Sequence, residues 1–310
     1  MSNRRMWTIG VSLAVATVVA AFGAVSCSSL GFPLPPLPTA TTTDHPSPAR
    51  AGSSSASASA AGKRDCASRP SACGYPDATN TGVPAGTALA VHEGDLQIRT
   101  AGTVVANLDI RGCVSVLADN VTIRSSKISC TSNWGIGSFA DDNDGGLVVE
   151  DVEVDCQGTG GTALGSDGLV ARRVNLHGCE NGVDIGHGVT VEDSYIHDMV
   201  EVGGGHADGI QFGGEGNAVI AHNTIEIPDG TSAIITGHGG PFNGVTIENN
   251  LLGGGAYTLY CPDQPGSVDF RVLDNRFIRT ATYGPWTDCA SIDENRGNIW
   301  DETLVAVEPA

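Results

Sequence analysis

The chain has 310 residues, 42 of them glycine and nine cysteine, and its 35 acidic residues exceed its 16 basic ones to give a net charge of −19 at pH 7. This excess of negative charge excludes nucleic acid as a partner. A polyanionic glycan would also be repelled, unless cations bridge the two.

Residues 1–26 have the features of an export signal. Arg4 and Arg5 precede an apolar run that small residues interrupt too often for a permanent membrane span. Cys27 follows Ala-Val-Ser, which resembles a bacterial lipobox with alanine three residues before the cysteine. We expect lipidation of Cys27, with ordinary cleavage as the alternative. The protein would then be extracellular or in the cell envelope, and would meet a membrane only through that lipid anchor.

The region that follows the signal, 27–65, is rich in Ser and Pro. Its stretches PLPPLP, TATTT and SSSASASAAG cannot bury a core, so we predict a disordered tether. The folded part then consists of an N-terminal segment and cap over 66–101 and one repetitive domain over 102–310.

The repetitive domain contains eight copies of one nine-residue pattern. The second, fourth and ninth positions are apolar and the third and fifth are mostly polar, as in GVTVEDSYI, which predicts a strand with one buried face. Successive copies start 18 to 29 residues apart, the length of one solenoid coil. The copies occupy 102–110, 120–128, 146–154, 168–176, 188–196, 217–225, 244–252 and 269–277.

A second apolar stretch follows most copies, as GVDIG, GIQFG, AIITG or YTLY. Two or more strands in each coil and no helical period predict an all-β fold, a right-handed parallel β-helix solenoid of about eight to nine coils. Leucine-rich repeats are the main alternative, but these coils are rich in Val and Ile and uneven in length. The register predicts a stacked interior of Val121, Leu147, Leu169, Val189 and Val245.

Eight cysteines follow Cys27, which in an exported chain indicates disulfides. In the coil frame Cys113 and Cys130 lie on neighbouring coils, as do Cys156 and Cys179. Pairing Cys130 with Cys156 would leave the other two three coils apart, roughly 14 Å, which is too far for a bridge. We predict the disulfides Cys113–Cys130, Cys156–Cys179, Cys261–Cys289 and Cys66–Cys73.

Equal positions on stacked coils form columns of side chains. Position five alternates in sign, which we interpret as ion pairs between strands rather than a binding stripe, in Arg124, Glu150, Arg172 and Glu192. Position seven predicts an asparagine ladder of Asn223, Asn250 and Asn275. Position ten holds Asp155, His177, His197 and Glu226, whose side chains could bind a metal or transfer protons. The alternative is a solvated corner. The acidic stretch 141–144 is a partial calcium-loop signature, so Ca²⁺ is a candidate cofactor and a plain turn is the alternative.

The second apolar stretch carries the strongest candidate site. Aligning GVDIG with GIQFG places Asp184 and Gln211 outward on neighbouring coils, and an inserted loop between them ends in His206-Ala207-Asp208. Such a loop can build a cleft, and acid/base chemistry needs its groups around one space. We predict Asp184, His206, Asp208 and Gln211 as catalytic residues. For His206 and Asp208 the alternative is a turn that Asp208 caps before the following glycine.

Residues further along the same wall suit sugar binding. His187 follows the first of the aligned stretches, and His238 lies in a later GHGG segment. Flat aromatic faces suit stacking on sugar rings. The predicted substrate-binding residues are His187, His238, Tyr257, Tyr260, Tyr283 and Trp286. An apolar plug that closes the last coils is the alternative for the aromatic residues.

The GVTIENN-type coils, over about residues 95–300, resemble the right-handed parallel β-helix proteins of the pectate-lyase-like superfamily, in particular small secreted actinobacterial members. The segment CGYPDATNTGVPAGTAL looks like the start of the folded domain in that group. Members of the superfamily are mostly polysaccharide lyases, glycoside hydrolases and uronate epimerases, with tailspikes and adhesins among the rest. The coil motif is specific for fold and not for reaction.

No catalytic motif of that superfamily transfers residue by residue. HADGIQF and GHGG superficially match two polygalacturonase motifs, but the adjacent paired aspartates are absent, because the coil between reads TSAIIT. Calcium-dependent pectate lyases use a basic residue as Brønsted base. This chain has only Lys63 and Lys127 as lysines, and Arg271 and Arg276 lie on a different strand from the predicted site.

We therefore expect a secreted or surface-anchored monomer that acts on a polysaccharide. The groove for it would run along the outer face of the strands that the second apolar stretches form. A hydrolase needs one protonated and one ionised carboxyl, for which Asp184 and Asp208 are the candidates. A lyase needs a base, for which His206 oriented by Asp208 is the candidate. The alternative is a non-catalytic lipoprotein that binds glycan or scaffolds the envelope.

Overall fold

The structure is a computed structural model that describes residues 66–139, 145–236, 241–262, 266–287, 289 and 292–308. The predicted signal and tether, the lipidation site Cys27, the acidic stretch 141–144 and His238 lie outside the described residues. Within the described ranges, no helix is long and apolar enough to cross a bilayer.

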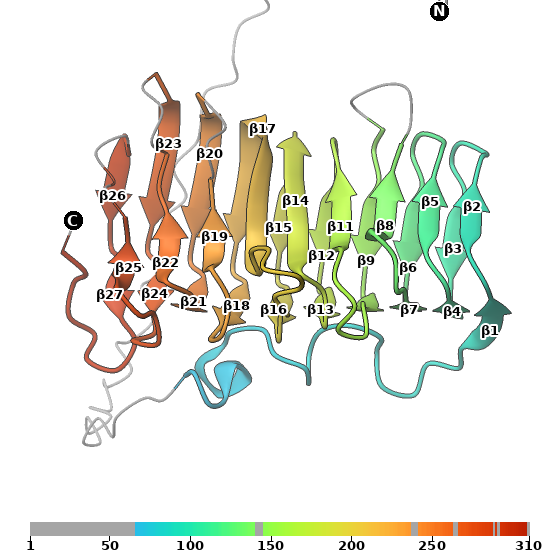
Figure 1. Cartoon of the computed structure of the whole chain (residues 1–310), viewed down its shortest axis with the longest axis horizontal. Helices are drawn as coiled ribbons and strands as arrows, with labels where there is room; N and C mark the ends of the chain where they lie inside the picture. The colour runs from blue at the N-terminus through green and yellow to red at the C-terminus, as the bar shows by residue number, and fades with distance from the viewer. Residues whose placement is uncertain are drawn as a thin grey trace, which may run out of the picture. The chain divides into compact units, whose positions relative to one another are not determined.

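The described chain is a parallel β-solenoid whose coils contribute three short strands each (Figure 1). A turn of 3-10 helix, η1 (Pro70–Cys73), precedes the strands. One sheet contains ten of the described strands: β1 (Ala90–Glu93), β4 (Leu108–Arg111), β7 (Lys127–Ser129), β10 (Glu153–Asp155), β13 (Asn175–His177), β16 (Tyr195–His197), β18 (Thr224–Ile227), β21 (Leu251–Gly254), β24 (Arg276–Phe277) and β27 (Ile299–Trp300).

The remaining strands stack in two columns that the long strand β17 (Asp208–Ala221) joins. The β14 column consists of β2 (Leu96–Ile98), β5 (Val114–Val116), β8 (Trp134–Ser138), β11 (Thr162–Ser166), β14 (Asn181–His187), β17, β19 (Ser232–Ile235), β22 (Tyr257–Tyr260) and β25 (Gly284–Trp286). The β15 column consists of β3 (Val104–Ala106), β6 (Thr122–Arg124), β9 (Val148–Glu150), β12 (Val170–Arg172), β15 (Thr190–Glu192), β17, β20 (Asn243–Glu248), β23 (Val268–Leu273) and β26 (Glu294–Arg296). The predicted all-β parallel solenoid is confirmed.

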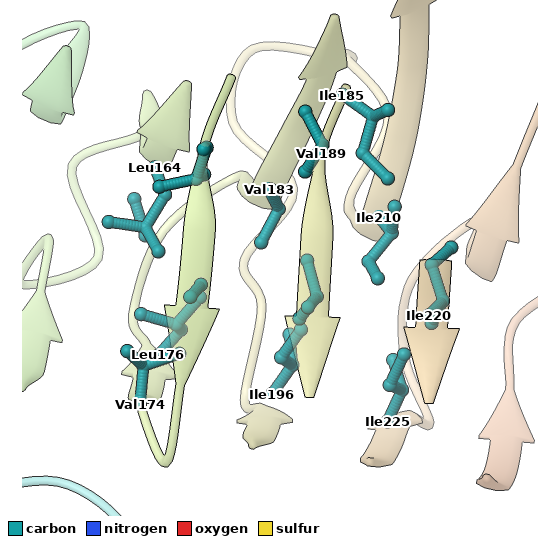
Figure 2. Close-up of a cluster of buried hydrophobic side chains, with 14 of the residues drawn as sticks. Leu164, Val174, Leu176, Val183, Ile185, Val189, Ile196, Ile210, Ile220 and Ile225 are labelled. Atoms are coloured by element: carbon teal, nitrogen blue, oxygen red, sulfur yellow. The ribbon is translucent and has the colours of Figure 1, made fainter. Parts of the chain in front are cut away.

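The predicted copies are in the predicted register, but each spans two strands instead of the one expected. The first strand lies in the β15 column and the second in the ten-stranded sheet, as β15 and β16 do in 188–196, because the chain bends between them at a residue with positive φ such as Asp193. Val148 pairs with Val170, Val170 with Thr190, and Thr190 with Val219, so equal positions meet on successive coils. Thr190 and Glu192 remain partly exposed on the outer face. The second-position residues are at most 1% exposed, namely Val121, Leu147, Leu169, Val189 and Val245. Figure 2 shows how buried side chains of several coils point into one interior, among them Leu164, Val183, Ile196, Ile210 and Ile225.

Two of the predicted polar columns support this architecture. The asparagine ladder is present and continues to Asn298: the Nδ2 of Asn250 donates to Asn275 at 2.9 Å, and the Nδ2 of Asn275 donates to Asn298 at 3.0 Å. In the charge column, Arg172 lies between Glu150, at 3.6 Å, and Glu192. The four predicted disulfides are also present: Cys66–Cys73, Cys113–Cys130, Cys156–Cys179 and Cys261–Cys289.

Residues 66–89 form a segment that we call the N-terminal strap, blue in Figure 1, which runs beside the coils in the opposite order to their sequence. The N–H of Cys66 donates to Asp301 next to the last strand, and the N–H of Gly82 donates to the carbonyl of Arg173 at mid-length. The strap then leads into β1 and β2, which lie within the part of the chain that we assigned to the cap. The N-terminal segment therefore connects the last coil with the first.

Candidate functional site

Two of the predicted catalytic residues meet on the outer face of the β14 column. Asp184 on β14 pairs in register with Gln211 on β17, because the neighbouring apolar residues Val183 and Ile210 are buried and turn these two side chains outward. Both line a cavity of about 340 Å³, which we call the Asp184 cavity. Its other walls include Trp134, Ser138, Phe139, Gly165, Asp167 and Gly213.

Among the described residues, one side chain forms a hydrogen bond with the carboxyl group of Asp184. Its Oδ2 accepts a hydrogen bond from the Thr162 hydroxyl at 3.3 Å, whereas Oδ1 is buried and has no partner among the described residues. Burial raises the pKa of Asp184 to about 6, although the hydrogen bond from Thr162 opposes the rise. A carboxyl with such a pKa can give or take a proton near neutral pH. Gln211 is held in place by Asn181, whose Nδ2 donates to its Oε1 at 2.9 Å.

Asp208 lies beside this cavity but does not line it. The residue is 1% exposed at the start of β17, and it accepts a hydrogen bond from the hydroxyl of Ser232 on β19. Burial raises the pKa of Asp208 to about 6; the Ser232 hydrogen bond and the nearby His206 lower it, and the charge of Asp184 raises it. His206 is exposed on the preceding loop and also does not line the cavity. The structure therefore brings Asp184 and Gln211 to one open space and leaves Asp208 next to it.

An aromatic floor, not predicted from the sequence, forms one side of the Asp184 cavity. The indole ring of Trp134 lies over Gly165, where any side chain would collide with it. Phe139 is 50% exposed and meets Trp134 edge-on, with ring centroids 6.5 Å apart. One feature of the sequence could have indicated it: Trp134 begins the strand of its coil that lies in the β14 column, as Asn181 does two coils later.

A second and larger cavity, of about 1070 Å³, adjoins the first because Trp134 and Phe139 line both. We call it the Lys127 cavity. Its lining includes Asp95, Asp109, Arg111, Lys127, Asn133 and Gln157. We call the two adjoining cavities together the trough, with the aromatic floor at their junction.

The predicted tyrosines lie further along the β14 column. Tyr257 and Tyr283 have ring centroids 5.5 Å apart and line a separate cavity of about 570 Å³. Tyr260 lies closer to the site. Burial raises the pKa of Tyr260, and the charge of the nearby Asp208 raises it further. Trp286 is 3% exposed and packs edge-on against the ring of Phe277, which is the position expected of an apolar plug. Tyr283, at 71% exposed, is the aromatic face most open to a ligand here.

The predicted histidines fall into two places. His187 is exposed at the end of β14. Its backbone N–H donates to Oδ1 of Asp167 at 2.6 Å, and its ring Nε2 lies 3.2 Å from the side-chain amide nitrogen of Asn217. In the position-ten column, the rings of His177 and His197 stack with centroids 5.3 Å apart. Nδ1 of His197 is 2.6 Å from Asp198 Oδ2, and its Nε2 is 2.9 Å from Asn175 Oδ1. Across the residues that the structure describes, no group of three or more His, Cys, Asp or Glu side chains is arranged to hold a metal ion.

The trough combines features that suit a ligand rich in hydroxyl groups. It offers aromatic faces, an amide, and a carboxyl that exchanges its proton near neutral pH, in an elongated concave surface. No family model, no curated protein and no solved structure matches this chain.

Proposed function

We propose that this protein binds and hydrolyses a polysaccharide in the trough formed by the Asp184 and Lys127 cavities. The observation that carries the proposal is the Asp184 carboxyl, which has a buried, unpartnered oxygen and a pKa of about 6 and lines a cavity with an aromatic floor. Sugar rings stack on such floors, and cleavage of a glycosidic bond requires a proton donor for the leaving oxygen.

In this proposal Asp184 is the general acid and Asp208 the second carboxyl. Asp184 donates its proton to the glycosidic oxygen as the bond to the anomeric carbon breaks, and the second carboxylate takes a proton from the water that attacks that carbon. The two residues lie on neighbouring strands and three residues apart in register, which separates their backbones by about 11 Å. The distance between the two carboxyl groups in the bound complex decides between an inverting reaction, which needs about 6.5–9.5 Å, and a retaining one, which needs about 5–5.5 Å.

We favour hydrolysis over elimination because the candidate acid of a hydrolase, Asp184, lines the cavity, whereas the candidate base of a lyase does not. His206 is exposed on the loop and does not line the Asp184 cavity. We further propose that the chain is exported and anchored through Cys27, and that it belongs to the pectate-lyase-like superfamily. The parallel solenoid and the four disulfides are compatible with these assignments.

The second candidate is a non-catalytic lipoprotein that binds glycan or scaffolds the envelope. The observation that favours it is the position of Asp208, which is buried, bonded to Ser232 and outside the cavity lining. In that case the trough would bind sugar chains without cleaving them.

A panel of neutral and acidic polysaccharides, assayed for binding, for new reducing ends and for unsaturated-uronate absorbance, separates these functions. We expect new reducing ends with the wild-type protein and none with Asp184→Asn. Asp229→Asn is the matched control, because Asp229 is exposed and lines neither cavity. Binding without cleavage would favour the second candidate, and the absence of any glycan binding would overturn both hydrolysis and glycan binding and leave only the scaffold.

A further inference from the structure

The charged groups around the Asp184 cavity are negative. Asp167 and Asp184 line it, and no lysine or arginine is among the lining residues. Burial raises the pKa of Asp208 beside this cavity; the charge of His206 lowers it, and the charges of Asp184 and Glu180 raise it, so the charges of both carboxylates reach this position. A sugar that carries a carboxylate would enter this field with the wrong sign.

The two cations of the adjoining Lys127 cavity are already paired. The Nη1 of Arg111 is 2.8 Å from Glu93 and its Nε is 3.2 Å from Asp109. The Nζ of Lys127 is 2.6 Å from Glu153. A uronate would have to compete with these carboxylates for either cation, and so this end of the trough offers no compensating attraction.

The junction between the cavities is suited to uncharged sugar faces. Gly137 and Gly165 have no side chains, and a Cβ atom at either position would collide with the ring of Phe139 or Trp134 respectively. The two rings therefore lie against the strands of the sheet instead of being displaced into the trough. Stacking on an aromatic face depends on apolar contact and is indifferent to the sign of the field.

We propose that the trough selects an uncharged polysaccharide, which lies across Trp134 with sugar residues in both cavities, and that Asp167, together with the ionised form of Asp184, rejects uronate chains. The proposal rests on the proposed function and assigns its substrate class. It also predicts that the tyrosine-lined cavity near Tyr283 is not needed for this selection.

The test uses the full chain and one neutral oligosaccharide series, together with the same series oxidised at C6 to uronates. Titration calorimetry at low ionic strength, once with a chelator and once with added Ca²⁺, measures both affinities. We expect the uronate form to bind at least about tenfold more weakly in both conditions, because like charges would be brought together. Added salt should narrow the difference by screening.

Variants locate the effect. Asp167→Asn should narrow the neutral-to-uronate ratio, Asp229→Asn should leave it unchanged, and Trp134→Ala should weaken both ligands. Uronate binding as tight as neutral binding in wild-type protein, with or without Ca²⁺, would overturn the inference and leave the proposed function standing. If neither series binds, the proposed function itself is wrong.

Discussion

The imidazole of His222 joins the N-terminal strap to the solenoid, since its Nε2 lies 2.7 Å from the carbonyl oxygen of Gly74. On its other side, Nδ1 lies 2.6 Å from a carboxylate oxygen of Asp193. Both partners are hydrogen-bond acceptors, and either ring nitrogen can donate when it carries the proton. Tyr75 on the strap also packs near the ring, with centroids 5.7 Å apart.

Replacement of this histidine should therefore loosen the strap. We expect His222→Ala to lower the free energy of unfolding by about 1.5–3 kcal/mol, the range for hydrogen bonds to charged groups such as the Asp193 carboxylate. Limited proteolysis should cut residues 66–89 faster in this variant, while Asp229→Asn should behave as wild type. Unchanged stability and an equally protected strap would show that the contact with Gly74 is not needed for docking.

A second prediction concerns the pH dependence of stability at Asp184. Burial raises its pKa in the folded state to about 6, above the value of about 4 of an unfolded chain. The folded state therefore binds the proton more tightly than the unfolded state. The free energy of unfolding falls as the pH rises from about 4 to about 6, and the loss remains at higher pH. We expect Asp184→Asn to raise the free energy of unfolding by about 2 kcal/mol at pH 7.5 and to have little effect near pH 4. Urea titrations at the two pH values measure the difference, and an equal effect at both would contradict the prediction.

A third prediction tests the aromatic floor. A side chain at Gly165 would occupy the place of the Trp134 ring, so Gly165→Ala should displace the indole and weaken glycan binding by at least about tenfold. Gly213→Ala is the matched control in the same cavity, because its Cβ would meet its nearest neighbour, Ile185 O, at an ordinary 3.8 Å. Tryptophan fluorescence reports the displacement and calorimetry the affinity. If both alanine variants bind glycan alike, the floor does not contribute to binding.

A fourth prediction separates catalysis from folding at Asp208. Asp208→Asn keeps an oxygen that can accept the Ser232 hydroxyl and removes the charge, so we expect turnover to fall by about 100-fold without loss of stability. Ser232→Ala keeps the charge and removes a bond that lowers the pKa of Asp208. Its pH–rate profile should therefore move to higher pH. Full activity in Asp208→Asn would transfer the role of second carboxyl to another group.

The sequence could predict the fold because one physical rule decides the register. A shift by one residue would bury Thr190 and Glu192 and expose Val189 and Val191, so a single alignment buries every apolar position. The same frame places cysteines on adjacent coils, which is why the disulfides were predictable. It also paired Asp184 with Gln211 correctly.

The features of the site that could not be predicted depend on the corners between strands and on irregular loops. Trp134 begins its strand four residues after Cys130, whereas Asn181 begins its strand two residues after Cys179, so the corners differ in length and no frame position identifies the aromatic floor. Asp208 is buried because it pairs with Ser232 on the next coil. The inserted loop before Asp208 interrupts the repeating pattern, so this pairing could not be predicted from the sequence.

The N-terminal strap gives the solenoid a connection that stacking alone does not provide. In a repeat protein each coil contacts only its neighbours, so the ends can fray while the middle stays folded. Here Cys66 bonds to Asp301 across 235 residues of sequence. During synthesis, the strap leaves the ribosome first but can dock fully only after the last coil has emerged. The end coils should then exchange their amide protons together with the middle ones, because opening either end requires the strap to be released.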